Sequence, residues 1–249
     1  MTMTFRRLFS LAPAALGLSV LLAGCAAPLP DYAAIVAAPD RSEADRKNDA
    51  RRNPVALFGF TGARPGMKVL DMGASAGYST ELLARAVAPD GTVYSQAPAE
   101  LFPNARKNYA VRAQSPAMKN AIRLEQPFDD PLPPGVAGFD LITFFFFYHD
   151  TVWMEVDRPR MNRALYEALK PGGILVVADH SARPGDAANE TRTLHRIEEN
   201  VVRRELEAAG FQFVAAGNFL RNTADARDTH VNKNKVPNDE FVLKFRKPW

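Results

Sequence analysis

The sequence predicts an α/β fold in which a mostly parallel β-sheet is covered by helices on both faces. Short apolar segments alternate along the chain with segments whose apolar residues recur at helical spacing. Several of the strand segments are apolar at every position, which is typical of strands buried on both sides. The chain has 249 residues, and the part that follows its N-terminal leader is long enough for one domain of this class.

The N-terminus has the pattern of a secretory signal. Arg6 and Arg7 precede an apolar stretch, residues 8–22, that is too short and too early in the chain for a permanent transmembrane helix. The stretch leads into Leu-Ala-Gly-Cys, ending at Cys25, which resembles the bacterial lipobox, where the cysteine becomes lipidated. An ordinary signal peptide in which Cys25 is incidental is the alternative.

We therefore expect a lipoprotein signal peptide over residues 1–25, a tether over residues 26–39 and a folded domain over residues 40–249. A lipid anchor at Cys25 would hold the protein on a membrane of the bacterial cell envelope, facing the periplasm. Lys and Arg number 31 against 28 for Asp and Glu, an excess too small to indicate a nucleic-acid partner. We expect a small-molecule substrate instead.

The first half of the domain is predicted to alternate between helices and strands. Residues 40–52 are charged and rich in helix formers, which indicates a surface helix that leads into the domain. Residues 78–88 carry apolar side chains at helical spacing, and a further helix is expected to begin near Pro103. Strands are predicted at residues 68–71, 92–95 and 122–124.

The second half continues this alternation and then changes. Residues 141–147 and 174–178 are continuous apolar runs that predict strands, and residues 160–169 fit a helix between them. Residues 189–209 predict one long amphipathic helix. Its apolar face would carry Leu194, Ile197, Val201 and Leu206, and Gly210 would end it. Two final strands are predicted at residues 211–214 and 240–245, joined through a polar stretch over residues 221–239.

A turn of small residues joins the first predicted strand to the helix that follows it. Asp71 ends the strand, and the turn contains Gly73, Ala74, Ser75 and Gly77. Small side chains allow backbone N–H groups to approach a ligand closely, and a helix N-terminus favours negative charge there. A tight strand-to-helix turn that binds nothing is the alternative.

This segment resembles the first motif of class I S-adenosylmethionine-dependent methyltransferases, in which two hydrophobic residues and Asp precede Gly-x-Gly-x-Gly. Ser75 stands where the middle glycine is expected. Further resemblances follow in the family's order at residues 66–71, 139–142 and 169–177. The resemblance implies a Rossmann-like sheet of seven strands with an antiparallel final strand, helices on both faces, and S-adenosylmethionine bound at the carboxyl ends of the strands.

By match of position, the resemblance implies that the turn from Asp71 to Gly77 holds the amino-acid part of the cofactor, through Asp71, Gly73, Ala74, Ser75 and Gly77. The family's second strand ends in an acidic residue that binds the ribose hydroxyls. Here Gln96 stands at that place and is expected to bind the ribose more weakly. Phe128 and Asp129 occupy the region that meets the adenine in the family.

Two polar pairs end the fourth and fifth predicted strands, which are neighbours in this fold. The pairs are His149-Asp150 and Asp179-His180. Methyl transfer to oxygen or nitrogen requires loss of a proton, so we predict that His149 is the catalytic base and that Asp150, Asp179 and His180 position it. The alternative is a helix cap at His149-Asp150 and a loop role for His180. Metal binding is a further possibility, but adjacent pairs lack the usual ligand spacing, so no metal ligand is assigned.

Three other features lie outside the assigned site. His195 and Arg196 border the apolar face of the predicted long helix and either reach the site or form surface salt bridges. Residues 144–147 are aromatic and are interpreted as core and pocket wall. Residues 221–239 form either a lid over the substrate or a mobile solvated loop.

The leading hypothesis is methyl transfer from S-adenosylmethionine to a small molecule or a component of the cell envelope. S-adenosylmethionine is a cytoplasmic metabolite, whereas the leader directs the domain out of the cytoplasm. The alternative is therefore a non-catalytic lipoprotein that uses the same fold to bind a nucleoside-like or other small ligand.

Overall fold

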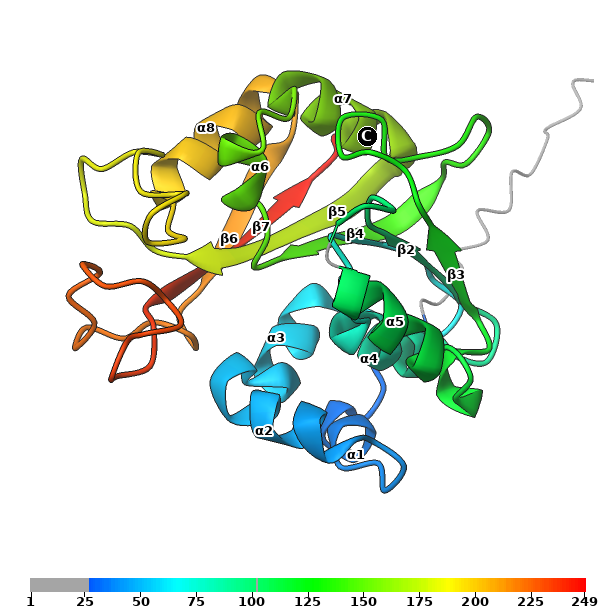
Figure 1. Ribbon diagram of the computed structural model, residues 1–249. Helices are drawn as coiled ribbons and strands as arrows, with labels where there is room; N and C mark the ends of the chain where they lie inside the picture. The colour runs from blue at the N-terminus through cyan, green and yellow to red at the C-terminus, as the bar shows by residue number, and fades with distance from the viewer. Residues whose placement is uncertain (1–26, 102) are drawn as a thin grey trace, which may run out of the picture.

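A computed structural model describes residues 27–101 and 103–249, so Cys25 and the predicted signal peptide lie outside the described residues. The described chain forms one sheet with helices on both faces (Figure 1). The strands are β1 (Lys68–Met72), β2 (Thr92–Gln96), β3 (Ala121–Leu124), β4 (Phe139–Phe145), β5 (Leu169–His180), β6 (Gln212–Gly217) and β7 (Glu240–Arg246). The helices are α1 (Tyr32–Val36), α2 (Glu43–Arg52), α3 (Pro54–Thr61), α4 (Tyr78–Val87), α5 (Pro103–Arg112), α6 (Asp150–Trp153), α7 (Arg158–Ala168) and α8 (Glu199–Ala208), with a 3-10 turn η1 (Pro116–Met118).

The sheet confirms the predicted fold class. Its seven strands lie in the order β3-β2-β1-β4-β5-β7-β6, and β7 runs antiparallel to both of its neighbours. The remaining strand pairs are parallel. In such a sheet the carboxyl ends of β1, β4 and β5 meet at one edge, which is where the predicted turn and the polar pairs are found.

Two hydrophobic clusters cover the two faces of the sheet. In β1, Leu70 and Met72 pack with residues of α7 and α8, whereas Val69 packs with α3 and α4 on the opposite face. This alternation follows from the two-residue period of a strand, and it explains why the predicted strands are apolar on both sides. Helices α6, α7 and α8 lie on the first face, and α1, α3 and α4 lie on the second (Figure 1).

The N-terminal boundary requires a correction. Residues 26–39, expected to be a tether, contain α1, so packed structure begins before Asp40. Tyr32 belongs to the hydrophobic cluster beneath α3 and α4, and its hydroxyl donates a hydrogen bond to the Ala63 carbonyl over 2.6 Å. Five residues are too few to predict a helix from sequence, because a helix this short is stabilised by tertiary contacts.

The predicted helix over residues 189–209 is wrong in its first half, since α8 begins only at Glu199. The segment before it is held to the end of β5, where Ile197 donates its N–H to the His180 carbonyl and accepts from the N–H of Ala182. His195 has a left-handed backbone (φ 55°), which is incompatible with a continuous helix. Tertiary hydrogen bonds therefore override a helical apolar pattern.

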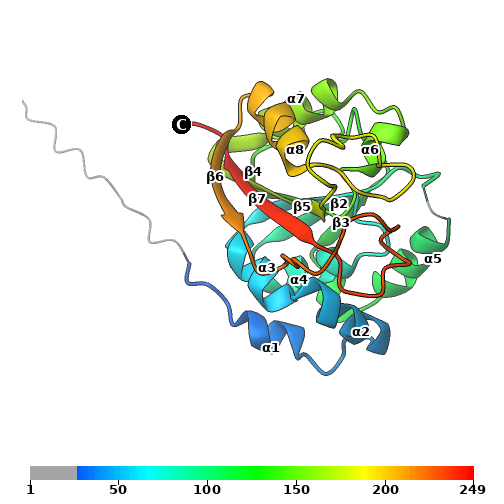
Figure 2. The same cartoon turned by 90° about the vertical axis from the view of Figure 1, so that its left-hand side faces the viewer.

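The polar stretch over residues 221–239 contains no helix or strand, but it is held in place rather than free. The Asp225 carboxylate is buried and accepts hydrogen bonds from Arg196 and from the backbone N–H of Asp239. Figure 2 shows this segment beside the loops that precede α8, and the Val231 N–H donates to the Leu194 carbonyl. No helix in the described part of the chain is long and apolar enough to cross a membrane.

Candidate active site

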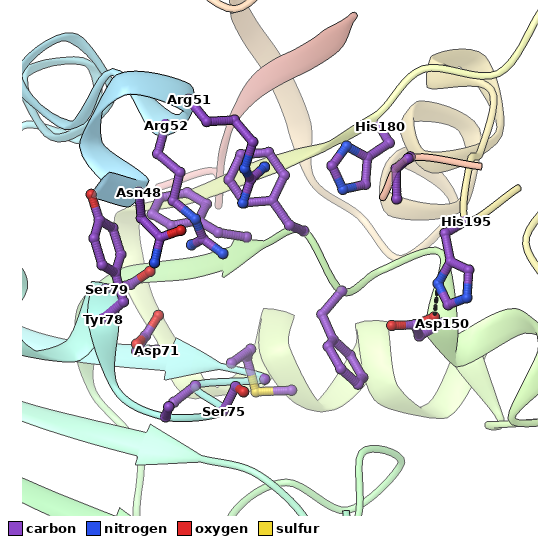
Figure 3. A pocket seen from close by; sticks show the side chains of 18 of the residues that line it. Asn48, Arg51, Arg52, Asp71, Ser75, Tyr78, Ser79, Asp150, His180 and His195 are labelled. Atoms are coloured by element: carbon purple, nitrogen blue, oxygen red, sulfur yellow. Dashed lines mark ion pairs between the residues drawn. The ribbon is translucent and has the colours of Figure 1, made fainter. Parts of the chain in front are cut away.

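A cavity of about 450 Å³ opens at the carboxyl ends of β1, β4 and β5. Figure 3 shows residues of α2 and of the turn after β1 on one side of it, and His180, His195 and Asp150 on the other. The lining comes from seven regions of the chain: Asp45, Asn48, Arg51 and Arg52; Asp71 to Ala76, Tyr78 and Ser79; Arg112; Phe145 to Phe147, His149 and Asp150; His180; His195; and Val231 and Asn232.

The turn after β1 has the small-residue geometry that the sequence predicts. Gly73 and Gly77 adopt positive φ values of 64° and 85°, and Ser75 is also left-handed. A Cβ atom added to Gly73 would lie 3.1 Å from the Cβ of Phe147, and one added to Gly77 would lie 2.9 Å from the ring of Tyr109. The turn therefore requires glycine at both places for conformation as well as for space.

Asp71 lies at the floor of the cavity with almost no exposed surface. Its carboxylate accepts hydrogen bonds from the hydroxyls of Thr80 (2.7 Å) and Thr143 (2.8 Å). Burial raises the pKa of Asp71 to about 6, and the two hydroxyls only partly offset this effect. Within residues 27–101 and 103–249, no cationic side chain is in direct contact with the buried carboxylate of Asp71.

The opposite charge comes from α2, where Asn48, Arg51 and Arg52 face the cavity. The guanidinium of Arg52 lies over the rings of Tyr78 and Phe146, and its Nε atom is buried without a hydrogen-bond partner among the residues that the structure describes. Burial and the neighbouring Arg51 lower the pKa of Arg52 to about 10. A buried donor without an acceptor is costly in a native protein, and this one lies on a residue that lines the cavity, where a ligand could supply the acceptor.

An ion-pair network holds α2 over this part of the cavity. Arg112 donates to the carboxylate of Asp45 (2.6 Å) and, through Nε, to the carbonyl of Ala76 (2.8 Å) in the turn. The hydroxyl of Tyr78 donates to Asp49 on α2 (2.6 Å). Because these bonds join α2 to the C-terminal end of the turn and to the start of α4, α2 is held in place relative to Asp71.

The far side of the cavity joins His149, Asp150, Asp179 and His195. Asp179 is buried and accepts from both the backbone N–H of His149 (2.8 Å) and its Nδ1 (2.7 Å). The Nε2 atom of His149 lies 3.1 Å from Asp150 Oδ1 and 3.1 Å from His195 Nδ1. His149, Asp150 and Asp179 therefore lie close together, as the sequence predicted. For His195 the sequence left open whether it reaches the site.

The base role predicted for His149 does not fit its surroundings. Burial by itself lowers the pKa of His149, but the carboxylates of Asp179 and Asp150 outweigh burial and raise it to about 10. An imidazole with this pKa keeps its proton at neutral pH and donates hydrogen bonds rather than accepting a proton. The two carboxylates were expected to orient His149 as a base, and they instead favour its protonated, cationic form.

His180 also lines the cavity, and a different carboxylate, that of Glu240, lies beside its ring. Its Nδ1 lies 3.0 Å from Glu240 Oε1, and the same oxygen accepts a hydrogen bond from Arg51 (3.0 Å). Burial lowers the pKa of His180, although Glu240 acts in the opposite direction. Glu240 thus links β7 to α2 through Arg51, which lines the cavity.

Four residues predicted to bind the cofactor do not line the cavity formed by the described residues: Gly77, Gln96, Phe128 and Asp129. The buried Gln96 side chain accepts from the Gly73 N–H (3.3 Å) and donates to the Gln126 carbonyl (2.7 Å), so it fixes the turn from below. The buried ring of Phe128 stacks on Phe147 with 5.1 Å between centroids. Gly77 also lies behind the lining, which Ala76 and Tyr78 form on either side of it.

Sequence reasoning missed the arginines of α2, because a charged helix near the N-terminus resembles a solvated surface helix. The spacing of Asn48, Arg51 and Arg52 at i, i+3 and i+4 places them on one helix face and was the available signal. The sequence also left open whether residues 221–239 reach the site. In the structure, Val231 and Asn232 of that segment line the cavity.

The family model described as protein-L-isoaspartate(D-aspartate) O-methyltransferase matches residues 55–202, which is more than half of the chain. No curated protein matches the chain. Among solved structures, the chain is similar to an S-adenosylmethionine-dependent methyltransferase from Aquifex aeolicus, with 19% identity, a TM-score of 0.61 and coverage of 87% of this chain and 98% of that one.

Two further solved structures show how widely this fold is used. An arsenic(III) S-adenosylmethionine methyltransferase from Chlamydomonas reinhardtii has 18% identity and a TM-score of 0.59, covering 90% of this chain and 75% of that one. The cyclase SpnF has 18% identity and the same TM-score, with 82% of each chain covered. At these identities the similarity establishes the fold alone.

Proposed function

The chain belongs to the protein-L-isoaspartate(D-aspartate) O-methyltransferase family, and from this premise we propose that it methylates a carboxylate oxygen of a small anionic acceptor. It is a class I S-adenosylmethionine-dependent methyltransferase, as the motif around Asp71 predicted. S-adenosylmethionine supplies the methyl group as an electrophile on its sulfonium sulfur. The identity of the acceptor is the part of this function that we propose.

The observation that carries the proposal is that one cavity is lined by a buried carboxylate, Asp71, and a buried guanidinium, Arg52, which do not form an ion pair with each other. Asp71 is buried without a cationic partner in contact, and Arg52 has a buried Nε without an acceptor. The amino-acid end of S-adenosylmethionine carries one ammonium and one carboxylate group. The residues present therefore fit that end, with Asp71 facing the ammonium and Arg52 facing the carboxylate.

The far side of the cavity supports an anionic acceptor. His149 and His195 line this side and Arg51 lines the cavity from α2; with no metal ion bound, the His149 pKa of about 10 keeps that ring positively charged at neutral pH. A carboxylate is already deprotonated at this pH, so it needs a positioned cation rather than a base before methyl transfer. This acceptor class agrees with the carboxyl methylation that the family name describes.

Two measurements test the proposal. Calorimetry with the purified chain should detect binding of S-adenosylmethionine and of its demethylated product. Incubation with S-adenosylmethionine labelled in its methyl group, together with short-chain carboxylic acids or an isoaspartyl peptide, should yield base-labile methyl esters. An alkali-stable methylated product would refute a carboxylate acceptor. Binding without any transfer would favour the alternative of a non-catalytic binding protein, and absence of binding would refute the proposal.

We further propose that the protein is anchored to a membrane of the cell envelope through a lipid on Cys25. The support is the signal-like leader and the Leu-Ala-Gly-Cys motif at residues 22–25. Cys25→Ser should release the protein from the membrane fraction of cells that express it. Retention of this variant in the membrane fraction would contradict lipidation at Cys25.

A further inference from the structure

Three side-chain atoms that could act as metal ligands form an equilateral triangle at the far side of the cavity. The Nε2 of His149 lies 3.1 Å from the Oδ1 of Asp150, and the Nδ1 of His195 lies 3.1 Å from each of these atoms. His149 and Asp150 are buried and His195 is half-buried. All three residues line the cavity, and Figure 3 shows His195 and Asp150 side by side at its edge.

We propose that His149, Asp150 and His195 bind a divalent transition-metal ion. First-row ions lie about 2.1 Å from imidazole nitrogen and carboxylate oxygen atoms. An ion at that distance from three donors spaced 3.1 Å apart subtends angles of about 95° between them. This is close to the right angles of one face of an octahedron, which is the arrangement of two histidines and one carboxylate in facial metal sites.

The groups behind the triad have the placement that metal ligands require. Asp179 accepts a hydrogen bond from Nδ1 of His149 over 2.7 Å, so Nε2 is the nitrogen that points to the site. Trp153 donates from Nε1 to the Oδ1 of Asp150 over 2.7 Å and fixes that carboxylate. A carboxylate that orients a histidine from behind is a regular feature of metal sites, because it fixes the ring and raises its basicity.

The fold also holds His195 in place through an unusual local structure. His195 has a left-handed backbone with φ 55°, a conformation that costs energy for a residue other than glycine. Its neighbour Arg196 is completely buried and donates to the Asp225 carboxylate (2.8 Å) and to the Ser181 carbonyl (3.1 Å). Arg196 therefore joins the ends of two loops, and this clamp directs His195 into the cavity.

The donor set and the surrounding charge favour a transition-metal ion. Two imidazoles and one carboxylate suit zinc, iron, cobalt, nickel or manganese better than magnesium or calcium, which prefer oxygen ligands. Asp150 and Asp179 bring two carboxylates to a buried histidine, and this negative charge is available to a metal cation that replaces a proton on His149. The remaining coordination positions would face the cavity.

Metal binding itself does not depend on methyl transfer. If the proposed function is also correct, the open coordination positions would bind the acceptor's carboxylate. This role of the metal ion in binding the acceptor rests on the proposed function. The two proposals can fail separately, because one is tested with metal ions alone and the other with S-adenosylmethionine alone.

The test is a calorimetric titration of the chelator-treated, dialysed chain with Zn²⁺, Mn²⁺ and Co²⁺, each without cofactor. We expect one ion per chain, and the Co²⁺ complex should have the weak visible absorption of a six-coordinate ion. His195→Ala and Asp150→Asn should each weaken binding about tenfold or more, and Asp179→Asn should weaken it about 10- to 100-fold.

His230→Ala is the matched control. The ring of His230 packs against His195 with 4.8 Å between centroids, but His230 is not part of the triad, so this variant should bind as the wild type does. Thermal unfolding and S-adenosylmethionine calorimetry on the same samples check that each variant is folded. Absence of stoichiometric binding by the wild type, or equal binding by His195→Ala, would overturn the metal site whatever the cofactor result.

Discussion

Replacing Asp71 by Asn is expected to stabilise the free protein while it weakens S-adenosylmethionine binding. Asp71 is 1% exposed and accepts hydrogen bonds from Thr80 and Thr143. Burial raises its pKa from the ordinary value of 3.8 to about 6. A carboxyl group that ionises less readily in the folded state than in the unfolded state destabilises the fold progressively as the pH rises from its unfolded pKa to its folded pKa.

The size and the sign of this effect follow from the pKa difference. About two pKa units correspond to about 3 kcal/mol, because each unit is worth about 1.4 kcal/mol. Below pH 3.8 the carboxyl of Asp71 is protonated in both states. As the pH rises toward 6, the unfolded chain loses its proton first, so the free energy of unfolding falls, and above pH 6 the loss is complete. Asparagine does not titrate and avoids this loss.

Urea unfolding of both proteins at about pH 5 and about pH 7.5 measures the effect. The advantage of Asp71→Asn should approach about 3 kcal/mol at the higher pH, or roughly 6 to 12 °C in Tm for a chain of this size, and should shrink at the lower pH. Asp40→Asn is the control with the opposite sign, because a hydrogen bond from Arg85 lowers the pKa of Asp40. If Asp71→Asn were less stable than the wild type at the higher pH, the destabilising charge would not reside on Asp71.

Three further predictions test the cavity and the domain boundary. Arg52→Gln should weaken S-adenosylmethionine binding about tenfold to a hundredfold in calorimetry, because a hydrogen bond to a charged group is worth about 1.5–3 kcal/mol; unchanged affinity would remove Arg52 from the cofactor site. Gly77→Ala should lower the free energy of unfolding by about 1–3 kcal/mol, since φ is 85° and the new Cβ would lie 2.9 Å from Tyr109; a neutral effect in urea unfolding would show that the turn relaxes. Tyr32→Phe should cost about 1 kcal/mol by leaving the Ala63 carbonyl without its 2.6 Å partner, and no change would mean that α1 unfolds independently of the domain.

The parts of the fold that could be predicted are those whose pattern is local. The apolar runs of β4 and β5 are long, and both of their faces are covered, so they stand out from any helical period. Helix α1 and the segment before α8 could not be predicted, because their conformations depend on Tyr32 and Arg196 finding partners distant in the sequence. The apolar residues of the segment 189–198 recur at helical spacing, so the sequence indicates a helix there. In the structure, the backbone of Ile197 instead forms a hydrogen bond with the end of β5.

The same distinction applies to the site. The residues of the turn from Asp71 to Gly77 are consecutive in the sequence, so the turn can be recognised from its small residues alone. His149 and Asp179 could be brought together because parallel strands place their carboxyl ends at one edge. Arg52 and His195 reach the cavity from a helix and a loop outside this strand framework, and Gln96 bonds to the turn instead of facing the ligand. Position in a motif therefore predicted proximity better than it predicted the direction of a side chain.

Several features that weaken the free protein lie around one cavity, and the two buried charges among them are the strongest argument for a charged ligand. Asp71 and Arg52 line the same space and carry opposite charges, yet they form no ion pair with each other. Ser75, Phe146 and His195 line it with left-handed backbones, which cost energy unless the surrounding structure enforces them. A neutral ligand would leave both buried charges unmatched. A ligand that carries a cation and an anion at separate positions satisfies both at once, which is the property that the amino-acid end of S-adenosylmethionine provides.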